Sequence, residues 1–201
     1  MQNVSNQIKT EILSKRKGKI FFLDDFAKFG SKNTVRQTLF RLCNENFIIR
    51  LSAGIFLHPK TDKHIGIIYP SIEKVASEIA KREKARLIPT GAYALNALGL
   101  STQMPMRVVF LTDGTPRIIN IEGKASIKFK KTIPKYLALR GKIMTLAVFA
   151  MKEIGQKQIS DEHLSKIKKA LEQEKKENIE HDIKLAPEWI TNILLKLTNN
   201  D

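Results

Sequence analysis

The stretch that decides the fold of the first part of the chain is Ser31–Leu57, with the sequence SKNTVRQTLFRLCNENFIIRLSAGIFL. Ser31 is a residue type that commonly caps helices, and apolar residues recur after it at helical spacing. Those apolar positions are Val35, Leu39 and Leu42. They predict a helix that runs to about residue 44 with one face turned toward a core. Two β-rich runs follow, and the Ser-Ala-Gly turn between them predicts a hairpin.

Two further helices are predicted upstream of this stretch. Apolar residues at positions 4, 8 and 12 indicate an amphipathic helix over residues 4–16. Asp24 is a good N-cap for a brief helix that ends before Gly30. The order of elements is that of a winged helix-turn-helix, and we expect residues 1–60 to form this DNA-binding domain.

The rest of the chain, from residue 70 to residue 201, predicts a second domain that mixes helices with short strands. A linker or edge segment is expected over residues 59–69. Helices are expected near residues 71–84, 91–98, 138–154, 160–178 and 187–197, and strands near residues 107–111, 117–121 and 125–129, with turns at Asp113-Gly114 and Glu122-Gly123. The predicted fold class is α+β: an N-terminal winged helix-turn-helix followed by a helix-and-small-antiparallel-sheet domain, which extends to about residue 134 and ends in helices.

The chain carries a strong positive charge that is unevenly distributed. Its 35 Lys and Arg outnumber its 20 Asp and Glu, for a formal net charge of +15. The net charge is +7 over residues 1–60, +6 over residues 61–134 and only +2 over residues 135–201. Such an excess adds self-repulsion to the folded state and is typical of proteins with an acidic partner, such as nucleic acid or an anionic membrane. The plain alternative is a basic protein without such a partner.

The helix predicted after Ser31 presents polar and basic side chains on the face opposite its apolar residues. In a helix-turn-helix this helix lies in the major groove, where Arg reads guanine and Asn or Gln reads adenine. The candidates for base contact are Asn33, Thr34, Arg36, Gln37 and Arg41. Phe40 lies among them, and either packs against the first helix or touches a thymine methyl group. The alternative is that this face is merely solvated.

Contacts to the DNA backbone are expected from three places. The N-terminus of the same helix favours phosphate, the hairpin flanks the duplex, and a basic run follows the first helix. The candidates are Lys17, Ser31, Lys32, Arg50 and Ser52.

The sequence offers little for catalysis, metals or membranes. Asp24 and Asp25 are adjacent and point apart, the four histidines lack metal-ligand spacing, and the single Cys43 excludes an internal disulfide. No enzyme activity, cofactor or metal is therefore expected. The longest apolar run, residues 143–151, is far too short for a membrane span, and residues 1–10 lack the apolar segment of a secretory signal. We expect a cytoplasmic protein without a membrane partner.

Three segments carry a family resemblance: TVRQTLFRL at 34–42, IRLSAGIF at 49–56 and PTGAYALNALGLSTQMP at 89–105. They resemble the abortive-infection AbiE-type antitoxins of type IV toxin–antitoxin systems, which act in phage defence. The likeness covers roughly residues 1–135, and the third segment is its most specific part. Residues 135–201 carry no such likeness.

The resemblance implies a transcriptional repressor that is also an antitoxin. Its winged helix would bind inverted repeats in double-stranded operator DNA and repress its own operon. Its remainder would counter a cognate nucleotidyltransferase-like toxin, without necessarily forming a stable complex with it. Within the third segment, Tyr93, Asn96 and Gln103 are the polar residues that could face a partner; the alternative for them is a role in the core or at a cap.

Two other functions stay open at this point. The first is a stand-alone winged-helix repressor whose second domain contacts another protein or dimerises. The second is a nucleic-acid-processing enzyme, which would need a clustered acidic or histidine site.

Overall fold

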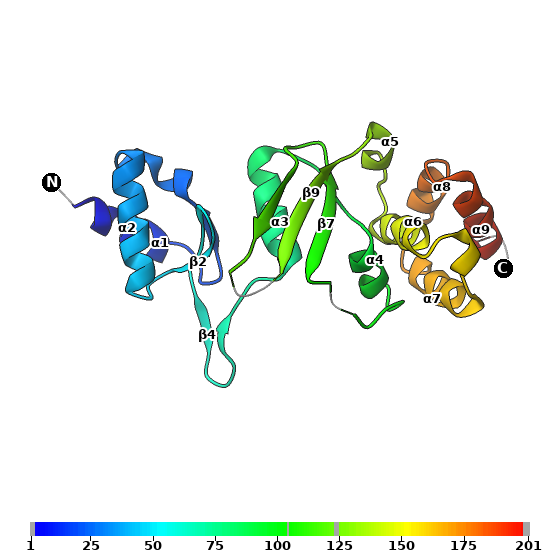
Figure 1. Ribbon diagram of the computed structural model, residues 1–201, viewed down its shortest axis with the longest axis horizontal. Helices are drawn as coiled ribbons and strands as arrows, with labels where there is room; N and C mark the ends of the chain where they lie inside the picture. Colours follow the sequence, from blue (N-terminus) through cyan, green and yellow to red (C-terminus); the bar gives the residue numbers. More distant parts are fainter. Residues whose placement is uncertain (1–2, 104, 123–124, 199–201) are drawn as a thin grey trace. The chain divides into compact units, whose positions relative to one another are not determined.

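The computed structural model describes residues 3–103, 105–122 and 125–198 of the chain. The polypeptide divides into two compact units, whose elements are labelled in Figure 1. Unit 1 comprises residues 1–78 and 120–124, and unit 2 comprises residues 79–119 and 125–201. Helices and small sheets together make the protein α+β, as predicted. Two residues that the sequence analysis singled out lie outside the described residues: Met104, in the family-like segment 89–105, and Gly123, in the second predicted turn.

Unit 1 begins with helices that pack on a small antiparallel sheet. The helices are α1 (Val4–Leu13), the 3₁₀ helix η1 (Leu23–Phe29) and α2 (Lys32–Asn44). The strands are β1 (Ile20–Phe22), β2 (Ile49–Ser52) and β3 (Ile55–Leu57), and β3 lies between the other two. The helices and the hairpin predicted for this region are therefore present, in the predicted order.

One apolar core joins these elements of unit 1. Its buried members are Ile8, Ile12, Phe21, Phe26, Val35, Leu39, Leu42, Ile48 and Phe56. Full burial of a side chain of this kind is worth about 1.5–3 kcal/mol, so the apolar stripes of α1 and α2 determine which of their faces turn inward. The opposite faces are left to solvent.

A second hairpin occupies the segment that was expected to be a linker or edge segment. It consists of β4 (Lys60–Asp62) and β5 (Gly66–Ile68), paired antiparallel. Asp62 Oδ1 accepts hydrogen bonds from the backbone N–H of His64 at 2.8 Å and of Ile65 at 3.2 Å, which fixes the turn. Strands of three residues leave almost no periodicity in the sequence, which is why the pattern missed them. Figure 1 shows the hairpin extending away from the β1–β3–β2 sheet.

The sheet of unit 2 is not the antiparallel sheet that the sequence predicted. The first helix, α3 (Ile72–Glu83), spans the boundary between the two units, which lies between residues 78 and 79. The elements that follow it are β6 (Leu87–Pro89), α4 (Ala92–Ala97), β7 (Arg107–Thr112), β8 (Arg117–Asn120) and β9 (Ser126–Lys131). The strand order is β6-β7-β9-β8, and β7 pairs with β9 in parallel, while β6 pairs with β7 antiparallel. Short turns favour antiparallel pairing of strands in chain order, but here β9 lies between β7 and β8 and pairs with β7 in the parallel direction.

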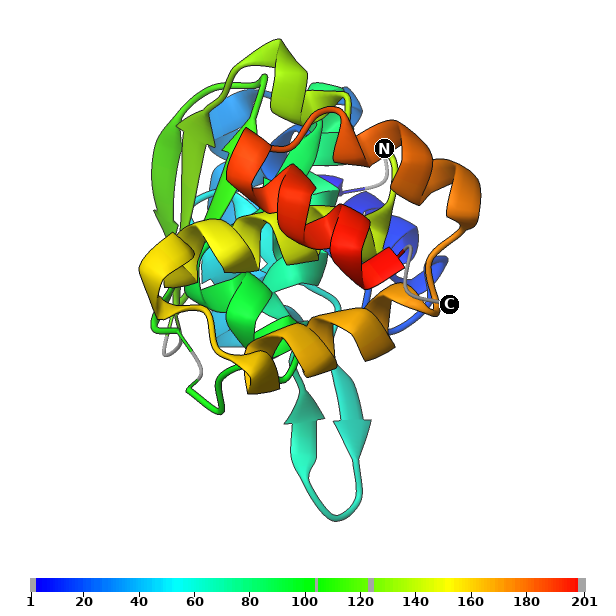
Figure 2. The ribbon, with the colours of Figure 1, turned by 90° about the vertical axis from the view of Figure 1, so that its right-hand side faces the viewer.

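Helices form the end of unit 2, and one of them is shorter than predicted. They are α5 (Pro134–Leu137), α6 (Lys142–Ile154), the 3₁₀ helix η2 (Gln156–Gln158), α7 (Asp161–Leu171), α8 (Lys176–Ile183) and α9 (Glu188–Thr198). The prediction of one helix over residues 160–178 is wrong, because α7 ends at Leu171 and a separate helix, α8, begins at Lys176. The helices α7, α8 and α9 pack around α6 (Figure 2).

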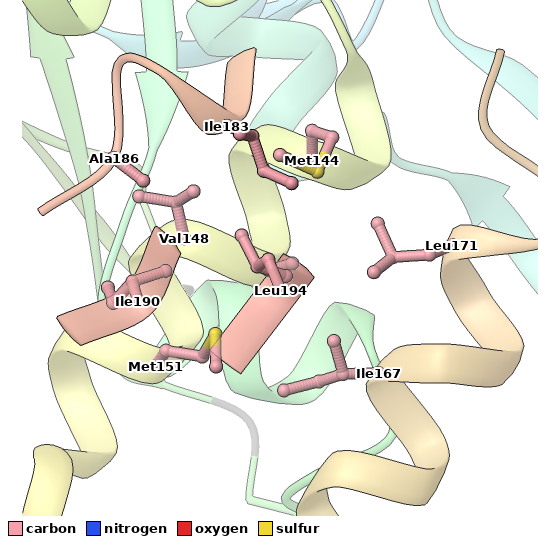
Figure 3. Packing of buried hydrophobic residues seen from close by; sticks show 10 residues of the cluster. Met144, Val148, Met151, Ile167, Leu171, Ile183, Ala186, Ile190 and Leu194 are labelled. Carbon is pink, nitrogen blue, oxygen red and sulfur yellow. The ribbon is translucent and has the colours of Figure 1, made fainter. Parts of the chain in front are cut away.

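The apolar run of α6 is the centre of this helical core. Every residue from Met144 to Met151 is buried. Figure 3 shows Met144, Val148 and Met151 of α6 facing apolar side chains from the other helices. A helix that is apolar on most sides belongs in the interior of a domain. Among the described residues, no helix has the length and apolar character needed to cross a membrane.

Candidate nucleic-acid interface

The exposed face of α2 carries most of the residues that the sequence singled out. Val35, Thr38, Leu39 and Leu42 are buried, so the register of the helix is fixed by its apolar side. Cys43 is half-buried, and the remaining side chains of the helix are exposed: Lys32, Asn33, Thr34, Arg36, Gln37, Phe40, Arg41 and Asn44. The structure thus brings the predicted base-contacting residues together on one accessible surface.

Arg36 and Gln37 lie side by side at the middle of this surface. Neither side chain takes part in a hydrogen bond or an ion pair within the described part of the chain. A guanidinium group and a primary amide that are both exposed retain their full donor and acceptor capacity for another molecule. These two side chains are therefore available to bind another molecule.

Arg41 is less available than Arg36. Its Nε atom lies 3.7 Å from Glu45 Oε1, one helical turn away, and Glu45 also accepts a hydrogen bond from Lys9 Nζ at 2.9 Å. Exposed pairs of this kind contribute only about 0–1 kcal/mol, so a phosphate or a base can replace the carboxylate at little cost.

The N-terminus of α2 is capped by the residues predicted to meet phosphate. Ser31 Oγ accepts a hydrogen bond from the Thr34 backbone N–H at 3.2 Å, and the two hydroxyl oxygens lie 2.8 Å apart. The hydroxyl groups of Ser31 and Thr34 are therefore used within the helix cap. Lys32 and Asn33 remain exposed beside the cap, where the helix dipole favours an anion.

Strand β2 carries Arg50 and Ser52, and Ser52 is its last residue before the turn to β3. The pairing register of the two strands shifts between these residues, and Gly54 takes the left-handed conformation, with φ of +72°, that the tight turn requires. Ser52 is half-buried, whereas Arg50 is exposed with its Nε atom 3.5 Å from Glu122 Oε1. A phosphate at Arg50 would have to compete with this exposed ion pair.

A cavity of about 460 Å³ lies between α2 and the β2–β3 turn. Its lining combines apolar side chains with three polar ones, those of Arg36, Gln37 and Arg50. The lining residues are Leu23, Arg36, Gln37, Phe40, Cys43, Arg50, Ala53, Gly54 and Phe56. Burial raises the pKa of the Cys43 thiol, so this thiol stays neutral and apolar in character. We call this cavity the α2 groove.

The sequence did not predict the α2 groove, because its walls come from η1, α2, β2, β3 and the β2–β3 turn. Leu23 comes from η1, Phe40 and Cys43 from α2, and Phe56 from β3. The one signal that could have indicated it is Phe40, a large apolar residue on the polar side of the helix.

The basic run after α1 places Lys17 in an exposed turn. The neighbouring Gly18 donates its backbone N–H to the His58 carbonyl oxygen at 2.7 Å, which ties the turn to the end of β3. Lys15 lies 3.4 Å from Glu11 Oε1, whereas no ion pair of Lys17 occurs within the described residues. Lys17 is thus a free surface charge next to the folded core of unit 1.

The three polar residues of the family-like segment lie in unit 2 and do not form a cluster of free side chains. The Tyr93 ring lies 6.1 Å from the Phe110 ring and packs against a buried cluster. Asn96 Nδ2 donates to the carbonyl oxygens of Ser101 at 3.2 Å and of Gln103 at 3.3 Å. Asn96 thereby holds the loop after α4, and only the Gln103 side chain is left exposed.

No grouping of His, Cys, Asp and Glu suitable for a metal ion occurs among the residues that the structure describes. The groups that the described surface of unit 1 offers to another molecule are guanidinium and amide donors, lysine charges and an apolar groove.

Comparison with known proteins identifies one family. No curated protein matches the chain. Residues 7–179 match the model of the "Family of unknown function (DUF6088)", which spans elements of both units. Because this match covers most of the 201 residues, the chain belongs to the DUF6088 family.

Proposed function

We propose that unit 1 is a winged helix-turn-helix module that binds double-stranded DNA. In this proposal η1 and α2 form the helix-turn-helix, α2 enters the major groove, and the β2–β3 turn is the wing. The single observation that carries the proposal is the pair of exposed side chains of Arg36 and Gln37, which have no partner within the described chain. Their position on a capped helix between η1 and a hairpin supports this reading, as does the net charge of +7 over residues 1–60.

The wider role that we propose is that of an antitoxin that represses its own operon. Unit 1 would bind the operator, and unit 2 would counter a nucleotidyltransferase-like toxin. The resemblance of residues 34–42, 49–56 and 89–105 to AbiE-type antitoxins supports this role. Unit 2 also has a hydrophobic core of its own, so a second activity does not need the core of unit 1. A stand-alone repressor remains the alternative, and an adjacent toxin gene whose product the chain neutralises would distinguish the two.

A binding selection from random duplexes tests the proposal at its centre. Arg36→Ala and Gln37→Ala should each relax base preference at one or two positions, because a bidentate base contact contributes about 1–3 kcal/mol of discrimination. Lys17→Ala is the matched control, and it should weaken binding evenly across sequences.

The same protein should lose affinity steeply as salt is added. Contacts to about 4–6 phosphates give a log–log slope of roughly −4 to −5 between affinity and salt concentration. Failure of the wild-type chain to enrich any duplex would overturn the proposal. An unchanged base preference in both the Arg36 and the Gln37 variants would show that α2 is not the recognition helix.

A further inference from the structure

Phe40 occupies an unusual place on α2 for a large apolar side chain. It is 59% exposed and does not belong to the buried core of unit 1, so it does not pack against α1. In the helix it follows Arg36 by four residues and Gln37 by three, which places all three side chains on one face. If Arg36 and Gln37 meet base edges, Phe40 meets the same groove of the duplex.

The α2 groove beside Phe40 has the composition of a site for a small apolar group at the edge of an anionic partner. Phe40 and Cys43 line it from the helix, and Phe56 lines it from β3. Two guanidinium groups line it, those of Arg36 and Arg50; Glu122 pairs with Arg50 at 3.5 Å, whereas no ion pair of Arg36 occurs within the described part of the chain. A negatively charged partner is thus favoured over a second copy of this strongly basic chain.

We propose that Phe40 reads the 5-methyl group of a thymine in the major groove. Thymine is the standard base that presents a methyl group there, and contact with Phe is one of the ways in which proteins recognise it. The apolar side chains that line the α2 groove of the protein remove that methyl group from water, while Arg36 and Gln37 hydrogen-bond the neighbouring base edges. This inference rests on the proposed function, because it assigns a specificity-determining residue to the same surface.

Replacement of thymine by deoxyuridine tests the inference, because it removes the methyl group and leaves the hydrogen-bonding edge unchanged. The full-length protein is titrated with its selected duplex, in which each thymine is replaced in turn. We expect one or two positions at which affinity falls about fourfold, the equivalent of roughly 0.8 kcal/mol for one buried methyl group. Elsewhere in the site the substitution should have no effect.

The variants then connect that loss to Phe40. In Phe40→Ala the thymine and uracil duplexes should bind equally well, whereas Phe40→Leu should keep part of the discrimination. Leu13→Ala is the matched control, because Leu13 is also an exposed apolar residue, at 63% exposure, but lies on α1. It should discriminate as the wild type does. Exposed side chains contribute little to the core, and thermal melting confirms that each variant is folded.

The outcomes separate the two proposals. If the wild-type chain selects no DNA, both proposals fail. If it selects DNA with a base preference but binds every uracil duplex as tightly as its parent, only the assignment of Phe40 fails. Full discrimination in Phe40→Ala would also overturn the assignment. A last possible outcome is that the protein self-associates, that Phe40→Ala abolishes this self-association, and that uracil has no effect. The α2 groove would then bind a second copy of the chain, and the assignment of Phe40 to thymine would be overturned.

Discussion

At the scale of single residues, His58 is a buried titratable group of unit 1. It follows β3 directly, is only 6% exposed, and stacks on Phe47 with the ring centroids 6.4 Å apart. Its Nδ1 atom is buried and has no hydrogen-bond partner among the described residues. Burial, with a smaller contribution from the charge of Lys17, lowers the pKa of His58 below its ordinary value of 6.5. The folded protein therefore favours the neutral form of this imidazole over the charged form.

The first prediction concerns the pH dependence of stability. Because the pKa of His58 is lower in the folded than in the unfolded chain, the unfolded chain binds the proton first as the pH falls. The free energy of unfolding should therefore be greatest above the unfolded pKa and should decrease as the pH falls from that value toward the folded pKa. Urea unfolding at a series of pH values measures this slope.

Variants assign the slope to His58. His58→Gln should flatten the dependence of the unfolding free energy on pH in this range, even though the variant is less stable overall. His64→Gln is the control, since His64 lies exposed at the turn of the β4–β5 hairpin. Equal slopes in the wild type and His58→Gln would contradict the prediction.

At the scale of elements, the N-terminus of α6 shows how the helical end of unit 2 is held together. Asp182 is fully buried, and its Oδ2 atom accepts hydrogen bonds from the backbone N–H of Gly141 at 2.7 Å and of Arg140 at 3.0 Å. Glu174 Oε2 accepts a hydrogen bond from the Ile143 backbone N–H at 2.8 Å. Both carboxylates lie at the positive end of the α6 dipole and satisfy N–H groups that a helix leaves unpaired.

This arrangement also explains the break between α7 and α8. Glu174 lies in the connection between them, and its Oε1 atom accepts a hydrogen bond from Asn178 Nδ2 at 2.9 Å. Partial burial opposes ionisation of Glu174, but the hydrogen bonds from Asn178 and from the Ile143 backbone prevail and lower the pKa of the carboxyl group. A continuous helix would carry Glu174 away from these donors.

The second prediction concerns Gly141, the N-cap residue of α6. A Cβ atom at this position would lie 2.8 Å from Glu174 Oε2 and 2.9 Å from Glu174 Cδ, so Gly141→Ala must displace the capping carboxylate. The loss of the cap and the unsatisfied N–H groups should reduce the free energy of unfolding by about 1–3 kcal/mol. Chemical denaturation of the two proteins measures this difference.

A double-mutant cycle shows whether the clash with Glu174 is the cause. In a Glu174→Ala background the same Gly141→Ala change should cost clearly less, since the displaced group is already gone. Additive effects of the two substitutions would mean that the carboxylate is not what Gly141 accommodates.

At the scale of the whole molecule, the two units have separate hydrophobic cores. The core of unit 1 draws on residues 8–56, and the largest core of unit 2 draws on residues 144–194. Units of this kind commonly fold and act as modules. The proposed repression and the proposed toxin neutralisation should therefore be separable by substitution.

The third prediction separates the two activities by substitution on α2. Changing Lys32, Arg36, Gln37 and Arg41 together to Ala should abolish operator repression, because all four are exposed on the proposed DNA-binding face. Rescue from the cognate toxin should persist, since no residue of unit 2 is altered. A reporter assay and a toxin co-expression assay measure the two activities. A folded quadruple variant that fails in both assays would show that protection depends on DNA binding.

Deletion of the C-terminal helices is not an equivalent experiment. The small sheet of unit 2 is covered by the same helices: Leu146 and Phe149 of α6 share a buried cluster with Ile88 of β6 and Ala94 of α4. A chain that ends near residue 135 would lose those contacts and expose this apolar surface. Substitutions on exposed faces test the modules without this loss.

By itself, the sequence determined the helices and the β2–β3 hairpin of residues 4–57, the α+β class and the outward position of Arg36 and Gln37. These features follow from helical periodicity, capping residues and turn signals, all of which act over a few neighbouring residues. The expected roles of those residues on DNA follow from their chemical type and stay predictions.

Only the tertiary structure decided how distant segments meet. The parallel pairing of β7 with β9 joins strands that are separated by β8, and the break before α8 depends on Glu174 reaching the start of α6. The α2 groove likewise needs side chains from η1, α2 and β3 at once. A local pattern carries no information about contacts between residues far apart in the chain. Such contacts contribute to the free energy of folding only after the folded core has brought the residues together.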